Sequence, residues 1–211
     1  MKIYHGTSLK NLNKILTNGF IKPRKGTGNW KDTLESNSEM VYLTNSYACY
    51  FAFNTAKELS SDNPNWQADD YDSSKAVVLE LDISIKNLYP DEDYLEQSSR
   101  WNGSKILEKD NSTMIADTVK FRDNFEQYKD QWKDSLELLG TVCHKGKISA
   151  SKIKRVAILR DEIFMVSQPT ITLTNQKHLG SQYRDECSNL IWTDQYSTAI
   201  LKTKNRKHIC L

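Results

Sequence analysis

The N-terminal segment joins a short strand pattern to a helix pattern, with a histidine, a glycine and two hydroxyls at the junction. Lys2–Tyr4 predicts a strand that ends at His5, and Gly6 would let another group approach the backbone closely. Thr7 or Ser8 can cap the following helix by accepting a backbone N–H. This order favours a ligand site at a strand end. The alternative is a core histidine beside an ordinary helix cap.

Apolar residues recur at helical spacing after that cap, and Gly19 marks the end of the predicted helix. The loop over 22–30 then combines three cations, two glycines and Trp30. In such a loop Arg24 and Lys25 could hold an anion together with backbone N–H groups, although a plain surface loop has the same composition. The apolar positions of the helix are Leu9, Leu12, Ile15 and Leu16.

A second strand-to-helix unit is rich in aromatic residues. Met40–Thr44 predicts a strand, and Ser46 can cap the helix that follows it. The aromatic side chains of this unit either pack in the core or form the walls of a slot for a flat ring. They are Tyr42, Tyr47, Tyr50, Phe51 and Phe53.

The middle of the chain predicts a central strand over Ala76–Ile83, a charged insertion and a long helix. In the insertion, the acids Asp91–Asp93 follow Pro90 directly. Consecutive carboxylates could bind a metal, but they more often begin a helix, where they favour its N-terminal dipole. We therefore expect a helix start and no metal site. Ile115–Leu139 predicts an amphipathic helix that ends at Gly140.

Two strands are predicted after this helix, at Thr141–His144 and Ile153–Leu159, with a turn over Ile148–Ala150 between them. We expect both to pair with the N-terminal strands. The 211 residues predict one domain, with a core over 1–166 and a C-terminal extension over 167–211. Short edge strands and a short helix are predicted in that region at 164–166, 170–173 and 179–190.

Charge is nearly balanced: Lys+Arg 29 against Asp+Glu 27 gives a net charge of +2, which excludes a strong overall field for nucleic acid or an anionic membrane. The local exception is Lys145–Arg155, with five basic residues and no acid. No signal segment and no membrane-spanning apolar run is seen, so we expect a soluble, cytoplasmic protein or one delivered by another machine. Reduced thiols without metal spacing are expected at Cys49, Cys143, Cys187 and Cys210.

Three of these elements, in this order and spacing, resemble the His-Tyr branch of the ADP-ribosyltransferase superfamily. That branch includes diphtheria-toxin-like toxins, poly(ADP-ribose) polymerases and small bacterial or phage toxins such as the DarT-like enzymes. The matching elements are the strand with His5-Gly6-Thr7 and its helix, the strand Val41–Thr44 and its helix, and the strand-turn-strand of Leu138–Leu159. The resemblance covers residues 1–160. It implies an α+β fold of two packed, split, mostly antiparallel β-sheets with surrounding helices, and NAD⁺ as co-substrate in the cleft between them.

The resemblance also implies roles for individual residues. His5 would hydrogen-bond a ribose hydroxyl, and the Gly6 backbone would bind the nicotinamide carboxamide. Tyr42 would stack on the nicotinamide ring. The other implied NAD⁺ contacts are Thr7 near the adenosine, Tyr50 or Phe51 on the opposite face of the slot, and Arg24 or Lys25 at the pyrophosphate.

The implied reaction breaks the bond between nicotinamide and ribose through an oxocarbenium-like transition state, which an acceptor nucleophile then captures. Family members usually stabilise that cation with a glutamate, but the matching position here is Thr141, seven residues before Ile148. Glu137 would take the place of that glutamate only if the register of the match were shifted. Since a threonine cannot supply the charge of a carboxylate, the role of Thr141 as a catalytic residue beside His5 and Tyr42 stays open. Branches without the glutamate include RNA 2′-phosphotransferases, which carry a second histidine and arginines where this chain has Tyr42.

The expected function is therefore a NAD⁺-dependent mono-ADP-ribosyltransferase that acts as a toxin or defence effector on a macromolecule, with an antitoxin protein as a partner. The basic run at 145–155 slightly favours RNA or DNA over protein as the acceptor. The alternative is a catalytically inactive fold that binds NAD⁺-like ligands, RNA or a partner protein, and Thr141 is the residue that supports it.

Overall fold

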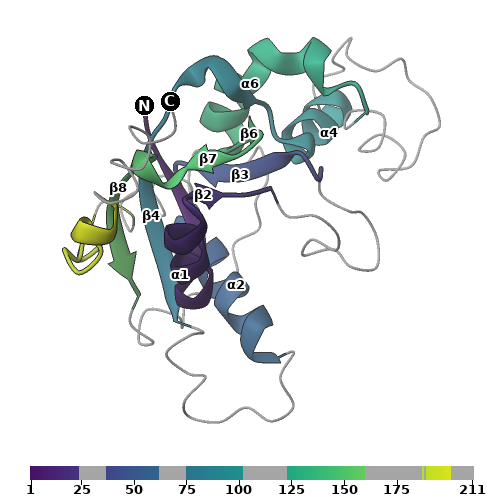
Figure 1. The fold of residues 1–211 in the computed structure, drawn as a ribbon. Helices are drawn as coiled ribbons and strands as arrows, with labels where there is room; N and C mark the ends of the chain where they lie inside the picture. Colours follow the sequence, from purple (N-terminus) through teal and green to yellow (C-terminus); the bar gives the residue numbers. More distant parts are fainter. Residues whose placement is uncertain (24–36, 62–74, 102–122, 160–186, 188, 201–211) are drawn as a thin grey trace, which may run out of the picture.

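The structure is a computed structural model that describes residues 1–23, 37–61, 75–101, 123–159, 187 and 189–200. These residues form an α+β fold with a six-stranded sheet in the order β5-β6-β3-β1-β4-β8 and a two-stranded sheet of β2 and β7 (Figure 1). All strand pairs within both sheets are antiparallel in this part of the chain. The strands are β1 (Lys2–Ser8), β2 (Phe20–Ile21), β3 (Met40–Thr44), β4 (Ala76–Asp82), β5 (Leu88–Tyr89), β6 (Thr141–Lys145), β7 (Ile148–Ser149) and β8 (Ile153–Ile158).

Strand β1 is longer than the sequence predicts. The predicted end is at His5, but β1 continues to Ser8 because each of its residues pairs with a residue of β4. Long-range pairing thus extends a strand that its own residues would end early. His5 consequently lies in the middle of a strand and not at its end.

The first helix, α1 (Leu9–Asn18), begins and ends where the sequence predicts. The Ser8 hydroxyl accepts the N–H of Asn11 at 3.2 Å, as an N-cap does. Gly19 follows with φ at 80°, and its N–H donates to Ile15. This left-handed conformation suits glycine and closes the helix.

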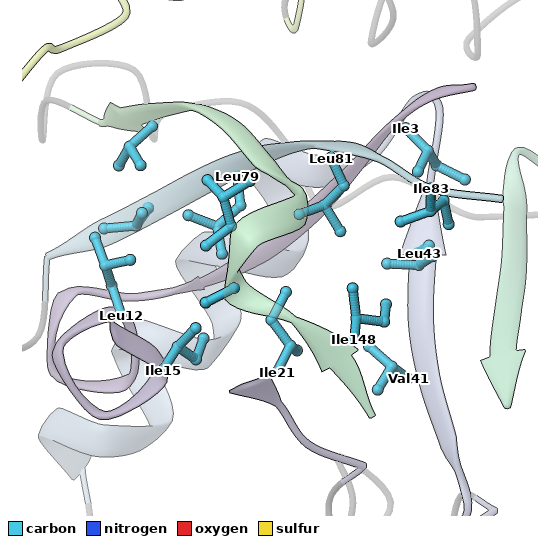
Figure 2. Packing of buried hydrophobic residues seen from close by; sticks show 14 of the residues in the cluster. Ile3, Leu12, Ile15, Ile21, Val41, Leu43, Leu79, Leu81, Ile83 and Ile148 are labelled. Carbon is cyan, nitrogen blue, oxygen red and sulfur yellow. The ribbon is translucent and has the colours of Figure 1, made fainter. Parts of the chain in front are cut away.

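The six-stranded sheet separates two apolar clusters, because successive side chains of a strand point to opposite faces. On one face, α2 (Ala48–Ser61) packs on β1 and β4 through Ala48 and Ala52. On the other face, α1 and the β2–β7 pair cover the main core (Figure 2). Side chains of that core include Ile3, Leu12, Ile15, Ile21, Val41, Leu43, Leu79, Leu81, Ile83 and Ile148.

The β2–β7 pair departs from the sequence prediction in one place, since Ile148–Ser149 is a strand where a turn is predicted. A two-residue strand is too short to show alternation, so only its partner reveals it. The predicted turn survives in part as the 3₁₀ turn η5 (Ala150–Lys152), which connects β7 to β8.

The helical run before β6 changes its winding along its length. The sequence predicts one amphipathic helix over 115–139; the described part is a 3₁₀ segment, η3 (Phe125–Gln131), a short α6 (Trp132–Asp134) and a π-helical turn, η4 (Ser135–Leu139). The N–H of Gly140 donates to Ser135, five residues back, and this bond closes the wider turn. The predicted end at Gly140 is confirmed, whereas residues 115–122 lie outside the described ranges.

Helix α4 (Glu92–Trp101) begins at the acids after Pro90, as predicted, and follows the 3₁₀ turn η2 (Ile85–Asn87) and β5. It lies with α6 at the β5–β6 end of the large sheet (Figure 1). No helix among the described residues is long and apolar enough to cross a membrane. The segments predicted at 164–166, 170–173 and most of 179–190 lie outside the described residues. The cysteines within the described ranges are buried and form no disulfide there: Cys49, Cys143 and Cys187.

Candidate functional site

His5 and Tyr42 meet where strands β1 and β3 separate. Within the described strands, β1 and β3 share only the pair Tyr4–Thr44, although they are neighbours in the sheet. Next to that pair, the His5 ring lies with Nδ1 at 3.0 Å from the Tyr42 carbonyl oxygen. A carbonyl only accepts hydrogen bonds, so Nδ1 carries the proton and Nε2 is left as an acceptor in the neutral ring.

Burial lowers the pKa of His5, although the bond to the Tyr42 carbonyl opposes this shift. The imidazole is therefore neutral at neutral pH. Alternation along the strands places the Tyr42 side chain on the sheet face of Thr44, and the His5 side chain on the opposite face. A ligand that touches both side chains must lie at the edge where the two strands separate.

The Tyr42 ring is half-buried, and its hydroxyl is fixed at two points. The backbone N–H of Asn37 donates to Tyr42 Oη at 3.0 Å. The hydroxyl itself donates to Oε1 of Glu92 in a short hydrogen bond. The other carboxyl oxygen of Glu92 lies 3.9 Å from Sγ of Cys143, a distance at which the thiol can donate a weak hydrogen bond. The tyrosine is thus tied to helix α4 through a carboxylic acid.

Two adjacent acids, Asp91 and Glu92, are buried at the start of α4, with 6% and 5% of their surfaces exposed. Asp91 accepts the N–H of Asp93 at 3.0 Å and donates its own N–H to the Ser135 hydroxyl at 2.9 Å. That hydroxyl in turn donates to the Thr141 carbonyl at 2.8 Å. The sequence predicts that these acids begin a helix, but it does not predict that two of them turn inward.

Burial sets the protonation of this acidic pair. It raises the pKa of Glu92 to about 7, with the charge of Asp91 adding to the shift and the Tyr42 hydrogen bond opposing it. Burial raises the pKa of Asp91 as well. Burial and the neighbouring carboxylates raise the pKa values of Tyr42 and Cys143 well above their usual ranges, so both stay protonated. Near neutral pH, the pair therefore holds a proton that an exposed carboxylate would have released.

Thr141, the predicted third-motif residue, lies buried at the start of β6. Its hydroxyl is close enough to Asp91 to lower the pKa of that carboxyl. No group in the described part of the chain meets Thr141 Oγ1 with hydrogen-bond geometry. Glu137, the alternative carboxylate, is exposed on η4 and does not join the cluster. The carboxyl group beside Thr141 is that of Asp91, for which the sequence predicts only a helix start.

Gly6 has a structural reason to lack a side chain. A Cβ at this position would lie 2.4 Å from both the Ala48 carbonyl oxygen and the Ala52 nitrogen of α2. The group that approaches the Gly6 backbone on this face is therefore a helix of the protein itself. Thr7, the next predicted contact, is 3% exposed in β1 opposite Val77.

The aromatic residues expected opposite Tyr42 contact other partners. The Tyr50 and Phe51 rings lie 5.5 Å apart between centroids, and Phe51 lies 6.4 Å from Tyr47. These contacts are all made by residues of α2 or just before it. Arg24 and Lys25, expected at the pyrophosphate, lie outside the described residues.

The basic run Lys145–Arg155 is partly neutralised. Lys145 pairs with Glu126, Lys154 lies 3.3 Å from Asp82, and Arg155 donates to Glu80 at 2.5 Å. Arg155 also stacks on the Trp192 ring, 4.2 Å from its centroid. The exposed residues Lys147 and Lys152 make no ion pair within the described residues and are the cations that this run leaves available.

No three His, Cys, Asp or Glu side chains in the described ranges are arranged to hold a metal ion. No protein-family model matches the chain, and the search of curated proteins returned no match.

Proposed function

We propose that the protein is a NAD⁺-dependent mono-ADP-ribosyltransferase with the split-sheet fold of the His-Tyr branch. The observation that carries this proposal is the bond between His5 Nδ1 and the Tyr42 carbonyl at the point where β1 and β3 separate. At the point where the two strands separate, the neutral histidine offers a ligand a hydrogen-bond acceptor, and the half-buried tyrosine offers it a flat surface.

In this proposal, His5 Nε2 accepts a hydrogen bond from a ribose hydroxyl of NAD⁺. The Tyr42 ring stacks on the nicotinamide. Gly6 contributes only its backbone groups, because α2 occupies the space on its Cα side. The edge of β1 that faces β3 is suited to this role, since the described residues show no β3 partner for it beyond Tyr4.

The reaction transfers ADP-ribose from nicotinamide to an acceptor. The bond from the nicotinamide nitrogen to ribose C1′ breaks and its electron pair leaves with nicotinamide. An acceptor O–H or N–H then forms the new bond to C1′ and releases its proton. Nicotinamide leaves uncharged, so the products are the modified acceptor, nicotinamide and one proton. His5 and Tyr42 orient the dinucleotide, while Thr141 supplies no charge to the cationic transition state.

The acceptor in this proposal is a nucleic acid, RNA or DNA, which binds through Lys147 and Lys152. The biological role is that of a cytoplasmic toxin or defence effector that an antitoxin protein inhibits. A protein acceptor is the alternative. A second candidate function, a binding module without catalysis, is favoured by one observation: the third-motif position holds a threonine whose hydroxyl is buried and without a described partner.

Release of free nicotinamide from NAD⁺, measured by mass spectrometry with DNA, RNA and cell protein offered in parallel, tests the proposal. Wild type should release nicotinamide and label an acceptor. His5→Ala and Tyr42→Ala should each lower the rate at least about a hundredfold, because each removes a group that orients the reacting bond. Tyr128→Ala, which removes a half-buried tyrosine from η3, is the matched control.

Circular dichroism and thermal melting should show that all three variants keep the wild-type fold. Binding of NAD⁺ without nicotinamide release would favour the binding module over the enzyme. A folded wild-type protein that neither binds NAD⁺ nor releases nicotinamide would refute both the enzyme and a module that binds NAD⁺.

A further inference from the structure

The Tyr42 side chain is held by a carboxyl group that comes from a distant part of the chain. Tyr42 lies on β3 and Glu92 on α4, 50 residues later. Between them, the hydroxyl accepts one hydrogen bond from the Asn37 backbone and donates the other to Glu92. With both bonds made, the ring has no freedom to swing about its Cα–Cβ bond without breaking them.

The carboxyl of Glu92 is itself fixed. The groups that face it are Asp91 just before α4, Tyr42 on β3, Cys143 on β6 and the Asn37 backbone amide. Ser135 ties the start of α4 to β6 by bridging the Asp91 N–H and the Thr141 carbonyl. The anchor for the tyrosine is therefore held by contacts to β3, η4 and β6.

The same polar cluster contains one unmatched group. Thr141 is 5% exposed, and its Oγ1 lies beside Asp91 without a hydrogen-bond partner in the described part of the chain. Buried hydroxyls in folded proteins are nearly always paired, so an unmatched one within a polar cluster is expected where a ligand atom or water completes the network. A ligand atom or water that completes the network at this hydroxyl would therefore lie beside the acidic pair.

We infer that Glu92 is a positioning residue of the NAD⁺ site: its carboxyl holds the Tyr42 hydroxyl and so fixes the face of the ring that the nicotinamide stacks on. The inference rests on the proposed function. Glu92 acts through the hydrogen bond it accepts, and a neutral side chain with an oxygen in the same place should therefore replace it.

The experiment measures the NAD⁺ dissociation constant by calorimetry for wild type, Glu92→Gln, Glu92→Met and Tyr42→Phe. Glu92→Met should weaken binding about tenfold, the order expected for the removal of one hydrogen bond, because its thioether gives the hydroxyl no comparable acceptor. Glu92→Gln keeps an oxygen acceptor and should stay within about twofold of wild type. Tyr42→Phe keeps the stacking surface but removes the anchor, so its effect should match that of Glu92→Met.

Two further proteins sharpen the result. The double variant Glu92→Met/Tyr42→Phe should bind no more weakly than the poorer single variant, because both changes remove the same bond. The matched control is Glu126→Met, since Glu126 accepts a hydrogen bond at 2.8 Å from another tyrosine, Tyr89 on β5. This control should leave NAD⁺ binding unchanged.

Three outcomes would each overturn the positioning role while leaving the proposed function standing. The first is wild-type affinity in Glu92→Met, and the second is a loss of affinity in Glu92→Gln as large as in Glu92→Met. The third is additive losses in the double variant. Absence of NAD⁺ binding by folded wild type would instead overturn the proposed function, and this inference with it. If Glu92→Met does not fold, Tyr42→Phe and Glu92→Gln decide the question, because they break and keep the same hydrogen bond from its two ends.

Discussion

At the scale of single residues, the fold buries a carboxylic acid, Glu92, that is only partly ionised near neutral pH. Glu92 is buried beside Asp91, and both carboxyls have raised pKa values because burial disfavours their charged forms. A protonated Glu92 still accepts the Tyr42 hydrogen bond, whereas an ionised one adds a second negative charge next to Asp91. The stability of the fold should therefore depend on pH through this residue.

The direction of that dependence follows from the pKa of Glu92, which is about 7 in the folded protein against an ordinary value of 4.5. Because the folded state binds this proton more tightly, the stabilising contribution is complete below the unfolded pKa and is lost as pH rises through about 7. Relative to Glu92→Gln, wild type should lose on the order of 1–3 kcal/mol of unfolding free energy between about pH 5 and about pH 8.

Urea unfolding of wild type and Glu92→Gln across this range measures the difference. Glu126→Gln is the control, since Glu126 is exposed and hydrogen bonds from Lys145 and Tyr89 lower its pKa. Its effect should not grow with pH above neutrality. Parallel stability curves for wild type and Glu92→Gln would show that Glu92 does not titrate between these pH values.

Residues that are close in sequence were the easiest to predict. The cap at Ser8, the stops at Gly19 and Gly140 and the helix start after Pro90 all follow from local backbone chemistry. The Tyr42–Glu92 bond could not be predicted in this way, because nothing in the residues around Glu92 distinguishes a carboxylate at a solvated helix start from one turned inward. The acids next to Pro90 were the visible signal, but only the packing of α4 against β3 and β6 reveals their burial.

At the scale of elements, the packing of α2 on β1 determines what Gly6 can do. Gly6→Ala should destabilise the fold by on the order of 2 kcal/mol or more, because its Cβ would lie 2.4 Å from backbone atoms of α2 that cannot rotate away. Gly19→Ala is the matched control: its φ is 80°, but no atom lies within 4 Å of the added carbon, so only the backbone strain of about 1 kcal/mol applies.

Thermal and urea unfolding of the two alanine variants test this packing. Gly6→Ala should be clearly less stable than Gly19→Ala. Equal destabilisation would mean that α2 moves away from β1 at little cost. The comparison also bears on activity measurements, because a loss of activity in Gly6→Ala can arise from disturbed packing of α2 and need not mean a lost ligand contact.

The same scale shows why some elements could not be predicted from the sequence. The strand β1 extends to Ser8 because β4 pairs with its whole length, and β2 and β7 exist only as partners of each other. The change from 3₁₀ to π winding over 125–139 likewise has no periodicity of its own. For these strands the deciding interaction joins segments far apart in the chain, which local propensity does not contain.

At the scale of the whole molecule, a net charge of +2 provides little attraction for nucleic acid, so any acceptor of this kind must bind to a local surface. Among the residues that the structure describes, acidic partners of Lys145, Lys154 and Arg155 leave Lys147 and Lys152 as the cations of the basic run without an ion pair. A double variant of these two lysines is therefore the sharpest test of the acceptor surface.

If nucleic acid is the acceptor, Lys147→Ala/Lys152→Ala should weaken its binding and reduce the salt dependence of that binding by up to about two units of slope, roughly 0.9 for each phosphate that the variant no longer neutralises. The affinity for NAD⁺ should not change, because in the proposed function His5 and Tyr42 hold the dinucleotide. Lys10→Ala/Lys14→Ala removes the same charge from exposed positions on α1 and controls for net charge. Equal effects of the two double variants would mean that nucleic acid responds only to total charge, and label found solely on protein at every salt concentration would exclude it as the acceptor.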